Sequence, residues 1–147
     1  YGHDIEGSWL MLETAEVIGD PALYEETLDK TYHLAHAALE GRTVDGALLY
    51  ERHESGAYDN DRHWWVQAEN VVGHANLYQH FDDEVAMQKA LRCWDFIKQH
   101  LVDYKYGEWH WSVRADGTVN TDDDKAGFWK CPYHNGRMCM EIIERFS

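Results

Sequence analysis

Apolar residues recur at helical spacing along five stretches of the chain. In the first stretch, for example, Ile5, Trp9 and Leu12 fall on one face, because side chains three to four residues apart meet on a helix. The pattern predicts helices over residues 4–18, 22–40, 62–81, 83–102 and 134–146. It therefore predicts an all-α protein.

Turn and capping residues mark several of the helix ends. Asp4 can cap the first helix, and Gly19 followed by Asp20 and Pro21 ends it. Pro21 also suits the first turn of the second helix, for which Gly41 is a suitable C-terminal cap. The first two helices are thus joined by a short turn.

Two long loops interrupt the helices. Residues 42–61 are rich in turn formers around the short apolar piece 47–50, which allows a short strand. In the second loop, 104–133, residues 108–113 alternate like a strand and would point Trp109 and Trp111 the same way, and Asp116-Gly117 predicts a hairpin turn. Short turns that alternate with long loops predict antiparallel helical hairpins with the long loops on one rim.

Composition fits one globular domain spanning residues 1–147. The chain is 44% hydrophobic and 27% charged, and 147 residues can bury a sizeable core. A net charge of −14 argues against nucleic acids and anionic membrane surfaces as partners. No run of about 18 apolar residues suggests a membrane span. Three cysteines without framework spacing predict a reducing, cytoplasmic setting.

Two histidines stand where proton transfer could occur. His3 and Glu6 share a face of the first helical turn, so the carboxylate could orient the imidazole of a general base. His134 begins the last helix, whose dipole disfavours its cation and leaves it able to accept a proton. Simpler interpretations are an acidic helix start at residues 3–6 and a histidine that hydrogen-bonds a loop at 134.

Aromatic residues are unusually abundant, at 14% with seven Trp and nine Tyr. They fit either Trp-based packing of helices or ring platforms for flat ligands, including the apolar faces of sugars. Trp65 and Glu69 lie four residues apart on one helix face. Core packing explains Trp64 well, but it explains the loop pair Trp109 and Trp111 less well.

A metal site finds little support among the ten histidines. The sequence contains no HExxH or CxxC pattern, and Asp122-Asp123-Asp124 lacks the spacing of a calcium loop. Cys131 lies near His134, but nothing around it favours a thiol nucleophile. We therefore expect no metal.

Four motifs appear in order along the chain, Gly2-His3-Asp4-Ile5-Glu6 with Ser8-Trp9, Trp64-Trp65 with Gln67-Ala68-Glu69, Glu108-Trp109, and Trp129-Lys130 with Pro132-Tyr133-His134-Asn135. Together they resemble the N-acylglucosamine 2-epimerase superfamily, and within it the cellobiose 2-epimerases. The resemblance implies an (α/α)6 barrel, of which this chain would be the C-terminal part. The family's N-terminal portion, which brings an arginine and a further histidine to the pocket, would then be a missing partner.

The resemblance also implies roles for residues of this chain. His3 and His134 match the acid and base histidines, and Glu6 matches the carboxylate beside the first. Residues that shape the pocket or stack on the sugar match Trp9, Trp65 (rather than Trp64), Glu69 and Trp129. The implied reaction converts the reducing-end glucose of a β-linked disaccharide such as cellobiose to its mannose epimer, with no redox cofactor or metal.

Two rival functions remain open at this point. A glycoside hydrolase on a similar helical barrel would use two carboxylates, for example Glu6 and Glu69. A non-catalytic carbohydrate-binding domain would bind the sugar without chemistry at C2.

Overall fold

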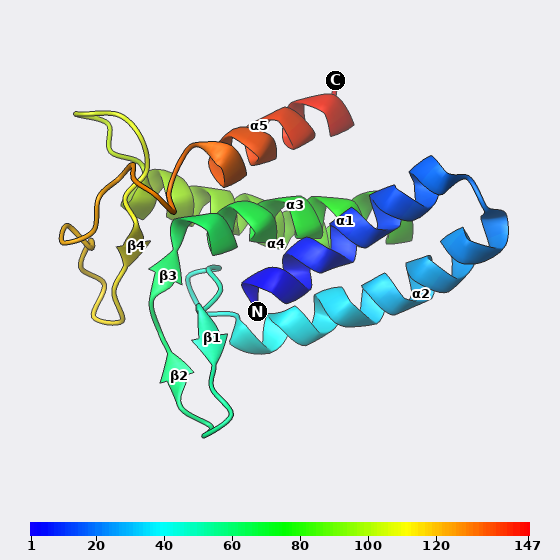
Figure 1. Ribbon diagram of the computed structural model, residues 1–147, viewed down its shortest axis with the longest axis horizontal. Helices are drawn as coiled ribbons and strands as arrows, with labels where there is room; N and C mark the ends of the chain where they lie inside the picture. Colours follow the sequence, from blue (N-terminus) through cyan, green and yellow to red (C-terminus); the bar gives the residue numbers. More distant parts are fainter.

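Five α-helices make up most of the chain in the computed structural model, which describes residues 1–147 (Figure 1). They are α1 (Gly2–Ile18), α2 (Pro21–Ala38), α3 (Trp64–Phe81), α4 (Glu84–Phe96) and α5 (Tyr133–Arg145). A 3-10 turn, η1 (Leu39–Gly41), follows α2, and a π-helical turn, η2 (Ile97–Leu101), follows α4. The predicted all-α class is confirmed.

Short strands tie the two long loops together. Strand β1 (Glu51–Arg52) pairs antiparallel with β2 (Tyr58–Asp59), and β3 (Arg62–His63) pairs antiparallel with β4 (Ser112–Val113). The predicted turn at Asp116-Gly117 is confirmed, because Gly117 has φ 87° and the Arg114 amide donates to the Thr118 carbonyl at 2.8 Å. The β3–β4 pair holds the second loop against the start of α3.

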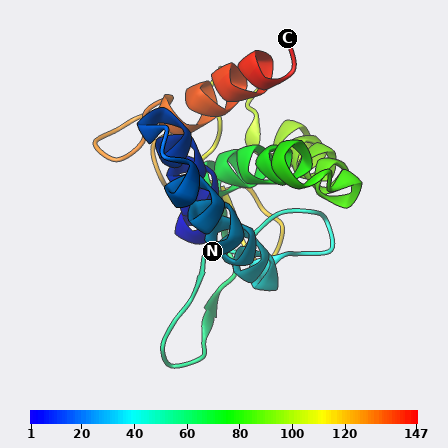
Figure 2. The same ribbon diagram turned by 90° about the vertical axis from the view of Figure 1, so that its right-hand side faces the viewer.

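The helices form two antiparallel hairpins, α1–α2 and α3–α4, that meet through α1 and α3 (Figure 2). Helix α5 packs against α3. The first residues of α1, α3 and α5 lie at the same end of the molecule, together with both long loops, on the left in Figure 1. The predicted rim of long loops is therefore present.

Some of the predicted helix caps are present in the structure and others are not. Gly19 (φ 72°) ends α1 and the Asp20 side chain caps α2, as expected. The predicted cap at Asp4 is wrong, since α1 already begins at Gly2. The predicted cap at Gly41 is also wrong, because α2 ends at Ala38 and tightens into η1.

Two predicted helices are shorter than their apolar patterns suggested. The one predicted over 62–81 begins at Trp64, because residues 62–63 pair with β4. The one predicted over 83–102 leaves α-geometry after Phe96 and continues as η2. The common direction of Trp109 and Trp111 stays a prediction: the Trp109 ring packs 6.3 Å from that of Trp94, and the Trp111 ring packs 4.7 Å from that of Trp64.

Close approach of α1 and α3 positions the site. Ile5 is fully buried, and a Cβ atom added to Gly73 would lie 2.4 Å from it. A Cβ atom on Gly2 would likewise lie 2.4 Å from the Trp65 ring. Such distances are shorter than van der Waals contact, so only glycine allows these helices to pack this tightly. The packing places His3, next to Gly2, against Trp65.

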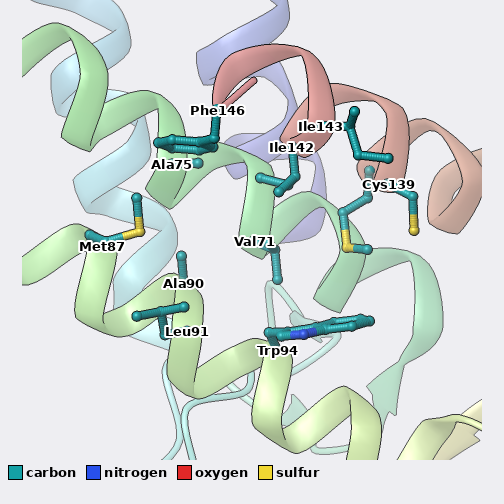
Figure 3. Close-up of a pocket in the computed structure, with 11 residues that line it drawn as sticks. Val71, Ala75, Met87, Ala90, Leu91, Trp94, Cys139, Ile142, Ile143 and Phe146 are labelled. Carbon is teal, nitrogen blue, oxygen red and sulfur yellow. The ribbon is translucent and has the colours of Figure 1, made fainter.

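An apolar groove of about 420 Å³ runs between α3, α4 and α5 (Figure 3). Every residue that lines it is apolar, and the set is Val71, Ala75, Met87, Ala90, Leu91, Trp94, Met138, Cys139, Ile142, Ile143 and Phe146. Ile143 is 67% exposed and Leu91 50% exposed, so a large apolar face is left uncovered. None of the helices combines the length and the apolar character that crossing a bilayer would require.

Candidate functional site

A cavity of about 460 Å³ opens at the rim where α1, α3 and α5 begin. Its walls are almost entirely aromatic, and its lining residues are His3, Tyr50, His63, Trp64, Trp65, Trp111, Trp129 and His134. Residues from both ends of the sequence thus meet in one cavity. The two histidines singled out in the sequence, His3 and His134, both line it.

The two histidines lie around Trp65. The ring centroid of His3 is 4.9 Å from that of Trp65, and the centroid of His134 is 5.5 Å from it. The His3 side chain is exposed and makes no hydrogen bond within the chain. Trp65, on the first turn of α3, is therefore the common contact of both imidazoles.

A buried carboxylate holds His134 in one orientation. Nδ1 of His134 lies 2.6 Å from Oε1 of Glu69, whose side chain is 1% exposed. Because an ionised carboxylate only accepts hydrogen bonds, Nδ1 is the donor and carries a proton. No group of the chain hydrogen-bonds Nε2, so that nitrogen is free for a ligand. Trp9 donates its indole N–H to the other Glu69 oxygen at 3.0 Å.

Glu6 has a different partner from the one expected. Its Oε1 accepts a hydrogen bond of 2.5 Å from Nη2 of Arg137 and lies 3.9 Å from Nδ1 of His134. The structure contains no hydrogen bond between Glu6 and His3, so the predicted pairing of the two is wrong. Glu69 is the carboxylate that orients a histidine. Arg137 was missed, although its position one turn after His134 on the same helix could have indicated it.

The other residues implied by the family resemblance lie at different depths. Trp65 lines the cavity, and so does Trp129, which is 80% exposed. Trp9 is fully buried, and with Glu69 it lies behind the cavity wall rather than in it. Glu69 contacts the cavity residue His134, and Trp9 contacts Glu69.

Four residues of the wall were not among the predicted site residues: Tyr50, His63, Trp111 and Trp64, for which core packing was expected. The rings of Tyr50 and His63 stack with centroids 4.0 Å apart. Burial lowers the pKa of His63. The position of Tyr50 in the apolar piece of the first loop was only a weak indication that it lines a cavity. His63 gave no such indication, because it reaches the cavity only through the pairing of β3 with β4.

A second carboxylate, that of Glu108, which is 26% exposed, fixes the segment that carries Trp129 and His134. Oε1 of Glu108 accepts hydrogen bonds from Lys130 Nζ at 3.1 Å, Asn135 Nδ2 at 2.8 Å and the Trp109 amide at 2.8 Å. Lys130 is fully buried. Burial alone would raise the pKa of Glu108, but these hydrogen bonds outweigh it and lower the pKa below its usual value. Each anchored side chain, Lys130 or Asn135, is the sequence neighbour of a cavity residue.

Removing the Glu108 charge is expected to destabilise the fold strongly. Glu108→Gln leaves the buried Lys130 ammonium without its ionised partner, which costs about 3–5 kcal/mol of unfolding free energy. Urea unfolding of the chain measures it. Asp95→Asn is the matched control, because Asp95 and Lys98 form an exposed pair worth about 0–1 kcal/mol. Equal effects of the two substitutions would contradict this assignment.

Two groups of side chains place possible metal ligands within 4.8 Å of one another. In the first, Glu6, Glu69 and His134, the guanidinium of Arg137 already contacts both carboxylates. In the second, Asp59, Asp61 and His63, the carboxylate of Asp61 accepts hydrogen bonds from the β4 loop, namely from Ser112 and the Ala115 amide. Neither group is assigned a metal.

Comparison with known proteins identifies the family of this chain. The model of the N-acylglucosamine 2-epimerase (GlcNAc 2-epimerase) family matches residues 1–136. The chain belongs to the N-acylglucosamine 2-epimerase family. The cellobiose 2-epimerase of Bacteroides fragilis is 57% identical over 144 residues, which are 97% of this chain and 37% of that protein. The cellobiose 2-epimerase of Ruminococcus albus is 44% identical over 146 residues, which are 99% of this chain and 37% of that protein.

A solved family structure has the same fold. The crystal structure of a sugar epimerase from a ruminal bacterium matches with a TM-score of 0.94 and 42% identity, covering all of this chain and 38% of that one. The prediction that these antiparallel hairpins form part of an (α/α)6 barrel is confirmed. The chain spans a little more than a third of the length of its family relatives.

Proposed function

We propose that this chain is the part of a sugar 2-epimerase that carries both proton-transfer histidines. The proposed reaction interconverts the reducing-end glucose and mannose of β-linked disaccharides such as cellobiose. One observation carries the proposal: His3 and His134 line one cavity against Trp65, and buried Glu69 leaves Nε2 of His134 free. The names of the family relatives support the same reaction class.

The chemistry needs two proton-transfer groups. Inversion at C2, next to the carbonyl of the opened sugar, takes a proton from one face and returns one to the other. His3 and His134 reach the cavity from different helices, α1 and α5, and imidazole exchanges protons near neutral pH. Donors around the reducing-end oxygens would stabilise the negative charge of the intermediate enediolate.

The cavity walls suit a sugar. Trp65, Trp111 and Trp129 present indole rings to the same space. Indole faces pack well on the C–H faces of pyranose rings, while the cavity histidines offer polar contacts to hydroxyl groups. We infer that these rings orient the disaccharide over His3 and His134.

The position of the carboxylates disfavours the hydrolase alternative. Glu6 and Glu69 are absent from the cavity lining, and both bind Arg137. A glycoside hydrolase needs two carboxyl groups that flank the scissile bond. A hydrolase site would therefore require a different pair of carboxylates.

The test of the proposed function is product analysis. The full-length protein is incubated with cellobiose, and the sugars are separated by chromatography. Formation of the glucosyl-mannose disaccharide without monosaccharide is expected. Free glucose would support the hydrolase instead, and unchanged cellobiose that nevertheless binds would support a binding domain.

We propose further that the remaining helices of the longer protein cover the apolar groove between α3, α4 and α5. The relatives are almost three times as long as this chain, which matches 37% of them. An uncovered apolar groove of about 420 Å³ is unusual for a free surface. Barrel helices outside this chain would bury it and complete the cavity rim.

Two exposed cysteines allow a test of this cover. Cys139 lines the groove, whereas Cys131 lies outside it. In the native full-length protein, maleimide labelling read by peptide mass spectrometry is expected to modify Cys131 and spare Cys139 until denaturant is added. Labelling of Cys139 in the native protein would contradict the proposed cover.

All three cysteines are free, in keeping with the cytoplasmic setting that we propose.

A further inference from the structure

A fixed cation lies among the groups behind His134. The nearest ligating atoms of Glu6, Glu69 and His134, from helices α1, α3 and α5, lie within 4.8 Å of one another, as in a metal site. Nη2 of Arg137 lies 2.5 Å from Glu6 Oε1 and 2.7 Å from Glu69 Oε1. The arginine thus bridges the two carboxylates of this group.

Arg137 is held in this position from several sides. Its Nη1 donates to the Tyr133 hydroxyl at 2.6 Å, and its guanidinium carbon lies 4.9 Å from the Trp9 ring centroid and 4.6 Å from that of Tyr133. The side chain is only 15% exposed. Burial alone would lower its pKa, but the hydrogen bonds to Glu69 and Glu6 raise it, so it stays charged. Lysine has no planar group that could make this set of contacts.

The charges that face His134 come from every element packed against it. Glu69 of α3 lies 2.6 Å and Glu6 of α1 lies 3.9 Å from its Nδ1. Both carboxylates favour the protonated imidazole, which cannot accept a proton from a substrate. The positive groups are Arg137 on α5 and, farther away, Lys130, whose ammonium lies 5.1 Å from the Trp64 ring centroid. The Tyr133 ring packs 4.9 Å from the imidazole, and His3 lies on the other side of Trp65.

We propose that Arg137 is a positioning residue for the epimerase reaction, a built-in cation that keeps both carboxylates ionised beside His134 and offsets their pull on its proton. Glu69 can then hold Nδ1–H of His134 in place while Nε2, which is unprotonated in the neutral imidazole, accepts the C2 proton of the substrate. This role rests on the proposed function. The charge balance itself can be measured without any turnover.

The experiment follows the titration of His134 by NMR in the full-length protein labelled with carbon-13 in its histidine rings, with His134→Gln to assign the signal. Arg137→Met is expected to raise the titration midpoint by roughly one unit or more, because one cation is lost between two carboxylates. Glu6→Gln is expected to lower the midpoint, because one carboxylate charge is lost. The double variant should return toward the wild-type value.

The same variants have a kinetic signature if the epimerase proposal holds. The acid limb of the pH profile of kcat/KM should move upward with the NMR midpoint in Arg137→Met, so the lost activity returns at higher pH. Arg137→Lys should restore part of the shift. Unchanged midpoints in both Arg137→Met and Glu6→Gln would overturn the proposed role of Arg137, and so would a pH-independent loss of activity. If the wild-type full-length protein does not epimerise, the proposed function is refuted instead. The NMR titration would still show whether Arg137 shifts the titration of His134.

Discussion

Replacing His134 with glutamine is expected to abolish epimerisation by the full-length protein, lowering kcat by about 10²–10⁴-fold. Glutamine can keep a hydrogen bond to Glu69, but it offers no nitrogen that accepts a proton at neutral pH. His3→Gln should have a comparable effect, because each histidine serves one face of C2. His3 makes no hydrogen bond within the chain, so its replacement should leave the fold intact.

Hydrogen exchange distinguishes two proton-transfer residues from one. In D2O each single variant should still exchange the C2 hydrogen of one epimer, and the two variants should act on opposite epimers. His33→Gln is the matched control, since His33 is an exposed side chain on α2 away from the cavity. Full interconversion by either the His3 or the His134 variant would show that the histidines have been assigned wrongly.

Replacing Glu69 is expected to have the second largest effect, on activity and stability together. Glu69→Ala leaves three donors without this acceptor, the His134 imidazole, the Arg137 guanidinium and the Trp9 indole, at a side chain that is 1% exposed. Breaking a buried charged network in this way costs about 3–5 kcal/mol. Urea unfolding of the full-length protein is the measurement.

Glu69→Gln separates orientation from packing. The amide has nearly the same shape, but its N–H group can donate to Nδ1 and so favour the tautomer in which Nε2 carries the proton. That tautomer cannot accept the C2 proton, and kcat should fall by about 10²-fold or more. Glu25→Gln, an exposed carboxylate on α2, is the control and should change neither kcat nor stability. Wild-type kcat in Glu69→Gln would show that Glu69 does not set the tautomer of His134.

The helices could be predicted because their pattern is local. Ile5, Trp9 and Leu12 are fully buried on α1, as their spacing required. The start of α3 and the end of α4 could not be predicted, since the pairing of β3 with β4 and the π-helical turn η2 depend on contacts with distant segments. Periodicity shows which helix face is apolar. It does not show whether a distant segment will pair with the first or last residues of the helix.

The cavity residues could be predicted only in part, for a similar reason. The family motifs indicated that His3, His134, Trp65 and Trp129 belong to one site, and all four line the same cavity in the structure. The helix dipole alone suggested a solitary His134, whereas the fold brings Glu69 from 65 positions away to contact it. Such contacts arise from the packing of α5 on α3, which leaves no periodic signal in the sequence.

The most direct test of the central claim is proton NMR of cellobiose in D2O with the full-length protein. If His3 and His134 exchange protons at C2 of the reducing-end glucose, the C2 proton signal should disappear while mannose-type anomeric signals grow. In His134→Gln the mannose-type anomeric signals should not grow, because interconversion needs both histidines. Retention of the C2 proton by the wild-type protein, with no mannose-type signals, would contradict the proposed epimerase function.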